Sequence, residues 1–436
     1  MNLGLMRHAE RCIRCGFCLE ACPTYKLTGQ ETLSPRGRIR LITSVMADGL
    51  PLSTDIVDSI DLCLGCRACE TACPSAVRYG AIVEGFRAHI EDSGVRARMQ
   101  GGAKRGLIEA MERPAAFAAS LSAAAQAHRI AGVPSMPGPV ARALSGRADD
   151  PALVPITPVH PRVGRLPDFS PAVGERRFTV CVLQGCVMRV MYHHVNLATL
   201  RVLQRLGCDV ICPPDLACCG ALDLHAGLHE AGRARARAFL DALRPYAFDA
   251  FVVNSAGCGS TLREYAEVLA DDPVWAEAAC SFSRRVRDVA EFVWAEALGA
   301  DASRLETARL DATVTYHDAC HLAHGQGITE APRRLLQAIP GVRILDLSES
   351  DMCCGSAGTY NLTQPGMARR LLDRKVANIA ATGAEIVAMG NPGCMAWIDT
   401  GLRSAGISTR VMHTIEVLDE AFGSIRPAAA EASDHR

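Results

Sequence analysis

The chain has 436 residues, 49% of them hydrophobic, and a formal net charge of −1 at pH 7. This length is enough for at least two globular cores, and the balanced charge gives no basic face for nucleic acid. No window offers the roughly 20 apolar residues of a membrane span, and charged residues interrupt the opening MNLGLMRHAERC where a signal peptide has its apolar core, so we expect a cytoplasmic protein.

The 20 cysteines are the outstanding feature of the composition. In a reducing compartment such a number indicates metal or redox chemistry and not structural disulfides. Two runs near the start, CIRCGFCLEACP and CLGCRACETACP, match C-x2-C-x2-C-x3-C-P, the bacterial ferredoxin pattern that holds 4Fe-4S clusters. Gly16 and Gly65 lie beside the second cysteine of each run and permit the positive φ that lets loop amides point at a cluster.

The ligands of the two clusters follow from this pattern, because in two-cluster ferredoxins the fourth cysteine of each run serves the other cluster. The assignment is Cys12, Cys15, Cys18 and Cys73 for one 4Fe-4S cluster, and Cys63, Cys66, Cys69 and Cys22 for the second. The alternative is structural zinc in two four-cysteine sites, which three-cysteine runs followed by proline do not favour. We expect residues 1–90 to form a helical, two-cluster ferredoxin-type domain.

The segments between the cysteine motifs carry structure but no chemical motif. LSPRGRIRLITSVMADG predicts a helix that begins at Pro35, with Ser34 as its N-cap. Residues 91–174 form an Ala- and Arg-rich helical segment and then, from 133, a Pro- and Gly-rich connection. The uncharged stretch 114–127 suits a packed or interfacial helix.

Residues 175–290 and 310–425 are predicted to be two copies of one cysteine-rich design. The first contains FTVCVLQGC, LACCG and FDAFVVNSAGCGS, and the second contains TVTYHDACH, DMCCG and AEIVAMGNPGC. The spacing is 33 residues from Cys186 to Cys219 in the first copy and 34 residues from Cys320 to Cys354 in the second. β-rich runs alternate with helical patterns, which is typical of an α/β domain with its sites at the carboxyl ends of strands. The expected fold class is α+β overall, with a helical ferredoxin-type module before two tandem CCG repeats.

The adjacent cysteines of each CCG are too close for an ordinary disulfide, so we interpret them as cofactor ligands on loops that glycine permits. The candidate ligands are Cys186, Cys218, Cys219 and Cys258 in the first copy, and Cys320, Cys353, Cys354 and Cys394 in the second. Burial as small core residues is the alternative for these eight. It is the favoured interpretation for the four cysteines without a counterpart in the other copy, which are Cys181, Cys208, Cys212 and Cys280.

Five histidines lie near these motifs: His317, His321 and His324 around Cys320, and His225 and His229 with the i, i+4 spacing of a possible helix. Zinc ligation or quinone contact is one interpretation, and a satisfied core or surface role is the favoured one. His317 is the residue of this set that most merits a test.

Taken together, the two ferredoxin runs, SPRGRI and the two CCG repeats resemble the family of glycolate oxidase iron-sulfur subunits over nearly the whole chain. The plan is also similar to the iron-sulfur subunit of anaerobic glycerol-3-phosphate dehydrogenase, to lactate-utilisation subunits and to heterodisulfide reductase. In the last family each full repeat gives five cysteines to a noncubane cluster and ends in C-x-x-C. Here Ser255 and Asn391 stand where the fifth cysteine would be, which disfavours noncubane clusters.

The resemblance implies an electron-transfer subunit of a glycolate dehydrogenase complex, with two 4Fe-4S clusters and further iron-sulfur clusters in the CCG domain. It implies that a separate flavin subunit oxidises glycolate to glyoxylate, that electrons go towards the quinone pool, and that the chain sits peripherally on the cytoplasmic face of the inner membrane. No catalytic residue is expected here, since dinucleotide, P-loop and G-x-S-x-G motifs are absent from the sequence. The alternatives are lactate or glycerol 3-phosphate as the substrate, a CCG domain that is itself catalytic, and CCG repeats that only form a scaffold.

Overall fold

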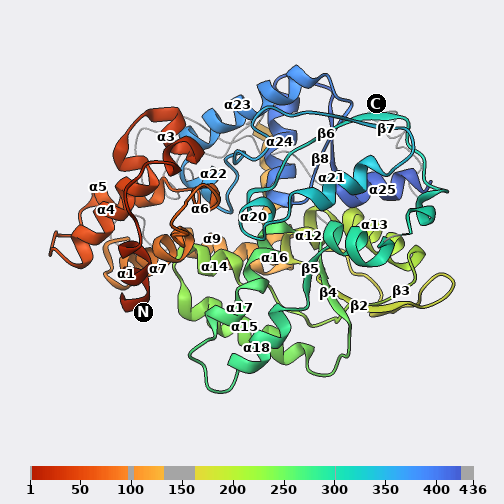
Figure 1. Ribbon diagram of the computed structural model, residues 1–436, viewed down its shortest axis with the longest axis horizontal. Helices are drawn as coiled ribbons and strands as arrows, with labels where there is room; N and C mark the ends of the chain where they lie inside the picture. Colours follow the sequence, from red (N-terminus) through yellow and green to blue (C-terminus); the bar gives the residue numbers. More distant parts are fainter. Residues whose placement is uncertain (1, 97–102, 132–162, 300, 424–436) are drawn as a thin grey trace.

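The computed structural model describes residues 2–96, 103–131, 163–299 and 301–423. A helical N-terminal domain precedes two α/β units, each built on its own mainly parallel sheet. In Figure 1 the N-terminal domain, in red and orange, lies at one end of the molecule, beside both units. This arrangement confirms the predicted α+β class.

The N-terminal domain consists of short helices around a small apolar core. They are α1 (Asn2–Glu10), α2 (Cys18–Ala21), α3 (Pro23–Thr28), α4 (Pro35–Met46), α5 (Thr54–Asp61), α6 (Ala68–Thr71) and α7 (Tyr79–Asp92). The predicted start of α4 is confirmed, because Ser34 Oγ accepts a hydrogen bond from the backbone N–H of Gly37 (3.0 Å). Ile42, Ile60 and Phe86 are fully buried between these helices, so their apolar faces hold the cysteine loops together.

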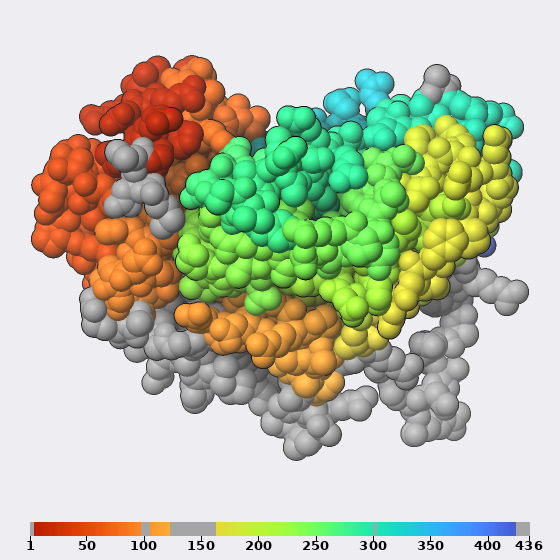
Figure 2. Space-filling model, turned by 90° about the horizontal axis from the view of Figure 1, so that it is seen from below, coloured from red at the N-terminus to blue at the C-terminus, as the bar shows by residue number. Residues whose placement is uncertain are grey.

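Two helices of the middle segment, α9 (Ala103–Glu112) and α10 (Pro114–Ala131), pack against the first α/β unit. Figure 2 shows α9 and the first part of α10 in orange along the surface of that unit, which is yellow and green. Phe117 and Ala118 form a small cluster with Val190. The predicted helix over 114–127 is confirmed, and it is packed over the residues whose side chains are described, which end at 122. The predicted Pro- and Gly-rich connection lies outside the described residues as far as 162.

The first α/β unit has a five-stranded sheet in the order β1-β3-β2-β4-β5. Its strands are β1 (Phe169–Ser170), β2 (Phe178–Val182), β3 (Cys208–Ile211), β4 (Ala250–Val253) and β5 (Val286–Asp288). Its helices are α12 (Cys186–Met191), α13 (His193–Arg205), α14 (Ala221–Ala226), α15 (His229–Leu243), α16 (Ala256–Arg263), α17 (Tyr265–Val268), α18 (Ala276–Ser283) and α19 (Val289–Phe292). Only β1 runs antiparallel to its neighbour.

The second unit has a four-stranded parallel sheet in the order β7-β6-β8-β9. Its strands are β6 (Ala312–Tyr316), β7 (Val342–Leu345), β8 (Ile386–Met389) and β9 (Arg410–His413). Its helices are α20 (Cys320–Ala323), α21 (Glu330–Gln337), α22 (Tyr360–Thr363), α23 (Pro365–Thr382), α24 (Pro392–Ser404) and α25 (Thr414–Ala421). The order repeats β3-β2-β4-β5 of the first unit, so the two copies share one topology.

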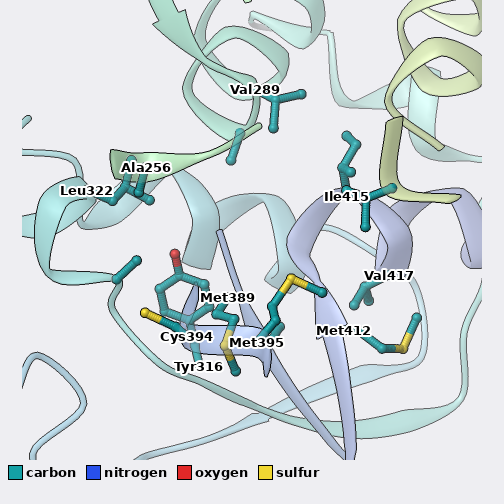
Figure 3. Packing of buried hydrophobic residues seen from close by; sticks show 14 of the residues in the cluster. Ala256, Val289, Tyr316, Leu322, Met389, Cys394, Met395, Met412, Ile415 and Val417 are labelled. Carbon is teal, nitrogen blue, oxygen red and sulfur yellow. The ribbon is translucent and has the colours of Figure 1, made fainter. Parts of the chain in front are cut away.

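The two units share a continuous core and are not loosely tethered. Arg201 of α13 pairs with Asp419 of α25 (2.5 Å), and the backbone N–H of Ala256 donates to the carbonyl of Gly390 (3.0 Å). Figure 3 shows residues of this core from both units, including Ala256 from the first and Met389 from the second. The loops that follow β4 and β8 therefore meet, and the carboxyl edges of the two sheets are brought close together.

Candidate metal centres

The two ferredoxin-type loops adopt the same unusual backbone. The residues before and after the second cysteine have positive φ in both runs: Arg14 (58°) and Gly16 (93°) in the first, Gly65 (64°) and Arg67 (64°) in the second. Residues of positive φ that alternate with right-handed residues turn the backbone amides towards the inside of a loop, where they favour bound anions. Glycine thus occupies only one of the two required positions in each run.

A small cavity in the N-terminal domain brings together Cys22 of the first run and Cys63, Cys66 and Cys69 of the second. No disulfide joins these thiols. Burial raises the pKa values of Cys66 and Cys69 well above that of a free thiol, so a bound cation is needed to keep them as thiolate ligands. The four thiols fit the cluster assigned to this set, and the backbone N–H of Gly65 already donates to Cys63 Sγ (3.4 Å).

A buried cation borders this cavity. Arg38 of α4 is 1% exposed, and its guanidinium donates to the carbonyl of Ser59 (2.7 Å) and to Thr24 Oγ1 (3.2 Å). Both acceptors are neutral, which leaves the positive charge without an anionic hydrogen-bond partner among the described residues. A thiolate-ligated cluster would supply the missing negative charge.

The set assigned to the other cluster lies nearer the surface. Cys12, Cys18 and Cys73 are partly buried against the apolar core of the domain, while Cys15 is exposed. Its neighbours Ile13 and Phe17 are 70% and 67% exposed. The first run therefore presents an apolar outer loop, whereas the second run faces the α/β units.

In the first CCG unit the four candidate cysteines come from loops at the carboxyl edge of the sheet. Cys186 begins α12, Cys258 lies in the first turn of α16, and Cys218 with Cys219 lies between β3 and α14. The Sγ atoms of Cys186 and Cys218 are 3.6 Å apart, and Cys219 interacts with both Cys218 and Cys258. A hydrogen bond from Cys186 lowers the pKa of Cys218 well below its usual value, so this set already favours one thiolate.

The second CCG unit repeats this arrangement more deeply in the protein. Cys320 begins α20 and Cys394 lies in the first turn of α24. Cys353 and Cys354 are 2% and 1% exposed. Their thiols link those of Cys320 and Cys394 into one continuous set, and Figure 3 shows Cys394 within the buried core. Helix N-termini favour anionic ligands. Each set of four candidate cysteines, here called a CCG quartet, has two of its thiols at such a position.

Ser255 and Asn391 occupy equivalent places just before α16 and α24. The amide of Asn391 donates to Cys394 Sγ (3.5 Å) and accepts from the backbone N–H of Gly257 in the other unit (3.2 Å). Asn391 thus links the two units and orients a thiol, a task that a cysteine ligand at this position would not perform.

A central cavity of about 620 Å³ connects these centres. Both CCG quartets border it. So do apolar side chains of α9 and α10, such as Met111 and Phe117, and Cys63 of the second ferredoxin-type run (63–73), which we call the inner ferredoxin loop. Glu112 of α9 is buried and pairs with Arg235. Burial, with the nearby Cys218 next in effect, raises the pKa of Glu112 to about 8. Sequence reasoning missed the middle helices as part of the site, because they carry no motif and reach it only through tertiary packing.

The N-terminal domain contacts both CCG units around the second cysteine run. Tyr360 Oη donates to the carbonyl of Leu62 (3.0 Å), and Arg87 donates to the carbonyls of Cys63 (2.6 Å) and His225 (2.9 Å). Cys66 lies close enough to Cys320 and Cys353 for their charges to interact. The inner ferredoxin loop is thus held directly against the second CCG quartet.

The predicted histidine interpretations require one correction. His225 and His229 do not share a helix, because Gly227 (φ 90°) ends α14 between them. His225 Nδ1 lies 2.7 Å from a carboxylate oxygen of Glu84 and His229 Nε2 lies 3.3 Å from the Glu84 carbonyl, so both serve the domain contact. His321 Nε2 donates to the carbonyl of Gly65 (3.2 Å). His317 is wholly buried.

Of the four cysteines without counterparts, two lie within strands β2 and β3, one follows β3 and one lies on α18. Cys181, Cys208 and Cys212 are fully buried in the apolar cores of the first unit, which confirms the packing interpretation for these three. Cys280 is partly buried on α18.

Comparison with known families supports the assignment of the ferredoxin-type region and of the two CCG units. The profile described as "4Fe-4S dicluster domain" matches residues 8–77, and the profile described as "Cysteine-rich domain" matches residues 180–263 and 314–399. The expected 4Fe-4S clusters and the repeated CCG design are thereby confirmed. Within the described residues, no helix is both long and apolar enough to cross a membrane.

Similarity to individual proteins extends over almost the whole chain. The "Probable glycolate oxidase iron-sulfur subunit" of Bacillus subtilis is 36% identical over 427 residues, covering 94% of both chains. The "Glycolate oxidase iron-sulfur subunit" of Escherichia coli is 35% identical over 414 residues, covering 94% of this chain and 93% of the relative. "Lactate utilization protein A" of an Exiguobacterium species is 29% identical over 241 residues, covering 55% of this chain and 97% of the relative.

Proposed function

The chain belongs to the family of glycolate oxidase iron-sulfur subunits, and on this premise we propose that it is the electron-transfer subunit of a complex that oxidises glycolate to glyoxylate. A separate flavin subunit removes the hydride, and this chain passes the electrons towards the quinone pool. The observation that carries the proposal is the position of the inner ferredoxin loop, whose Cys66 lies within interaction range of Cys320 and Cys353. This contact gives the cysteine sets a continuous path through the protein.

Iron-sulfur clusters, when bound, carry single electrons. A flavin that has accepted a hydride holds two electrons, so it needs a partner that removes them one at a time. The role of this chain is to hold the thiols in place and to keep water away from the inner sets. We propose as ligands Cys12, Cys15, Cys18 and Cys73 for the outer cluster, Cys63, Cys66, Cys69 and Cys22 for the inner one, and Cys186, Cys218, Cys219, Cys258, Cys320, Cys353, Cys354 and Cys394 for the CCG centres.

The outer loop is the proposed docking face for the flavin subunit. Ile13 and Phe17 are large apolar side chains exposed on both sides of Cys15. Such residues anchor protein interfaces when a partner buries them. Docking there places the partner next to the outer cysteine set, at the end of the path that is farthest from the CCG quartets. A cytoplasmic location is part of the same proposal, in keeping with 20 cysteines that form no disulfide.

The central cavity favours a second candidate, in which the electron acceptor binds within this chain. Its volume of about 620 Å³ is that of a typical small-molecule site. Its walls combine both CCG quartets with apolar side chains such as Met111, Phe117 and Leu121. A quinone ring suits such a lining, so this candidate makes the CCG domain the place where the acceptor is reduced.

The test is a change of one buried CCG ligand in the purified complex. Cys354→Ser is expected to reduce glycolate-dependent turnover by roughly 100-fold or more while the spectroscopic signals of the ferredoxin-type clusters persist, because serine is a poor ligand for iron. Cys280→Ser, on α18 and outside the quartets, serves as the matched control and should retain turnover. Full turnover in Cys354→Ser would show that the CCG quartets carry no electrons.

A further inference from the structure

His317 occupies a special place in the second CCG unit. It is the first residue after β6 and is 0% exposed. Its backbone N–H donates to the carbonyl of Ala388 on the neighbouring strand β8 (2.9 Å). The side chain therefore starts from the carboxyl edge of the sheet, the same edge from which Cys320 and Cys394 are presented.

One ring nitrogen of His317 is fixed by the protein. Nδ1 lies 3.1 Å from the carbonyl oxygen of Ser350. That oxygen can only accept, and it also accepts from Lys375 Nζ (3.3 Å) and from the backbone N–H of Asp318 (3.1 Å). Nδ1 must therefore carry the proton of this hydrogen bond. In the neutral ring, Nε2 then keeps its lone pair free.

Nε2 is buried and has no hydrogen-bond partner in the described part of the chain. An unpaired buried polar atom is costly, so a native protein normally satisfies it. Histidines that bind metals typically show this pattern, with one nitrogen donating to a backbone carbonyl and the other left for the metal.

The free nitrogen lies among thiols. A ring nitrogen of His317 and the Sγ atoms of Cys354 and Cys394 all lie within 4.8 Å of one another, and all three residues are buried. Since Ser350 engages Nδ1, Nε2 is the nitrogen available to this group. Metal bonds of about 2.0 to 2.3 Å to nitrogen and sulfur put neighbouring ligand atoms roughly 3.5 to 4 Å apart, so a small closure of the three side chains would complete a site.

We propose that His317 Nε2 is a metal ligand in the second CCG unit, together with the thiolates of Cys354 and Cys394. This inference rests on the part of the proposed function that places a metal centre in that unit. The donor set of soft sulfur and imidazole nitrogen suits iron of an iron-sulfur cluster, and it also suits zinc.

The first CCG unit lacks this ligand. Leu183 is the first residue after β2, at the place that corresponds to His317, and it packs in an apolar core at 2% exposure. The two units therefore differ in chemistry although they share a topology. The second unit can thus add a neutral imidazole nitrogen to its four thiols, whereas the first unit has thiols alone at the equivalent place.

The experiment uses the full-length protein, isolated with its partner subunits without oxygen from cells grown with 15N-histidine or with natural histidine. Metal analysis identifies the metal. For iron, pulsed electron paramagnetic resonance detects the strong coupling of a directly bound histidine nitrogen. For zinc, X-ray absorption at the zinc edge reports the ratio of nitrogen to sulfur ligands. We expect a bound histidine nitrogen in the wild type and its complete loss in His317→Leu, which copies the first unit.

Two further variants make the result independent of folding defects. His413→Asn changes another buried histidine of the same unit, whose two ring nitrogens both have hydrogen-bond partners, and it should keep the bound nitrogen. His317→Cys can restore a ligand with a negative charge, so an iron centre should keep its metal and shift to a more negative reduction potential.

An all-sulfur centre in the wild type, or a nitrogen signal that survives in His317→Leu, would overturn the ligand role of His317 and leave the proposed function intact. A total metal content of roughly eight irons per chain, as two 4Fe-4S clusters need, would also overturn the ligand role of His317. That last result would also remove the CCG metal centres from the proposed function, so the two failures are distinguishable.

Discussion

At the scale of single residues, Arg38 shows how a buried charge reveals what the site must hold. Its guanidinium is almost completely buried, and its hydrogen bonds go to the neutral oxygens of Ser59 and Thr24. Burying an unpaired charge costs several kcal/mol. The cavity formed by Cys22 and the three cysteines of the second run lies directly beside it, so an anionic cluster there offsets the cost.

The variant Arg38→Gln tests this relation. Removing a positive charge next to the cluster disfavours the added electron, so the reduction potential of the inner cluster should fall, by on the order of 100 mV at an effective dielectric constant of about 20. A redox titration followed by electron paramagnetic resonance measures the shift. Arg40→Gln changes an exposed arginine of the same helix and should leave the potential unchanged. Equal potentials in both variants would contradict the role of Arg38.

The residues of the site differ in how far sequence alone could predict them. The spacing of the cysteine runs is set by local loop geometry, so the sequence pattern was sufficient to name those candidates. Arg38 and Glu112 could not be named in this way, because their importance depends on which distant groups surround them. His317 could be singled out by its nearness to Cys320, but its free Nε2 depends on Ser350, which is distant in sequence and contacts it only in the folded chain.

At the scale of elements, the glycine of each CCG sets the course of the loop. Gly355 has φ 91°, and a Cβ at this position would lie 2.8 Å from the carbonyl oxygen of Ala368 on α23. Gly220 has φ 72°, and its Cβ would lie 3.2 Å from that of Arg235 on α15. The loop therefore lies directly against a helix, which fixes the direction of the preceding thiols.

The variant Gly355→Ala is expected to destabilise the protein by about 2 to 4 kcal/mol, since a backbone strain and a steric clash add together. Gly383→Ala is its control, because Gly383 also has positive φ at the end of α23 but a Cβ there would meet nothing within 4 Å. The control should cost only about 1 kcal/mol. Anaerobic calorimetry of both holoproteins measures the difference in unfolding temperature, and equal shifts would refute the clash.

Element boundaries were predictable where a local signal fixes them. Ser34 followed by proline marked the start of α4 correctly. The sequence VMYHHVNLATLRVLQRLG (190–207) has a helical pattern, but the structure breaks it at Tyr192 (φ −132°, ψ 38°), between α12 and α13. The cause is tertiary, because α12 packs against α10 whereas α13 packs against α25 of the other unit.

At the scale of the whole molecule, the outer loop allows a direct test of partner docking. Phe17→Asp should weaken binding of the flavin subunit roughly 30-fold, about 2 kcal/mol, if Phe17 is an anchor of the interface. Val274→Asp introduces the same charge at a similarly exposed apolar residue of the first CCG unit, and it should bind normally. Binding can be measured by anaerobic biolayer interferometry, and unchanged binding of Phe17→Asp would place the interface elsewhere.

The joining of the two CCG units into one core could not be predicted from the sequence. The repeat and its strand ends were visible in the pattern, but the contacts between Ala256 and Gly390, and between Arg201 and Asp419, join residues far apart in the chain. Local patterns carry no information about such pairings. The central cavity also depends on tertiary packing, because both CCG units and the helices α9 and α10 line it.

The most direct test of the central claim is to isolate the tagged protein from its native cells without oxygen and to assay the eluate for dye reduction with glycolate, lactate and glycerol 3-phosphate in parallel. An electron-transfer subunit of a glycolate-oxidising complex predicts glycolate-dependent reduction together with co-eluting flavin. Reduction only with lactate or glycerol 3-phosphate would contradict the proposed substrate. A flavin-free eluate that oxidises none of the three would contradict the proposed role itself.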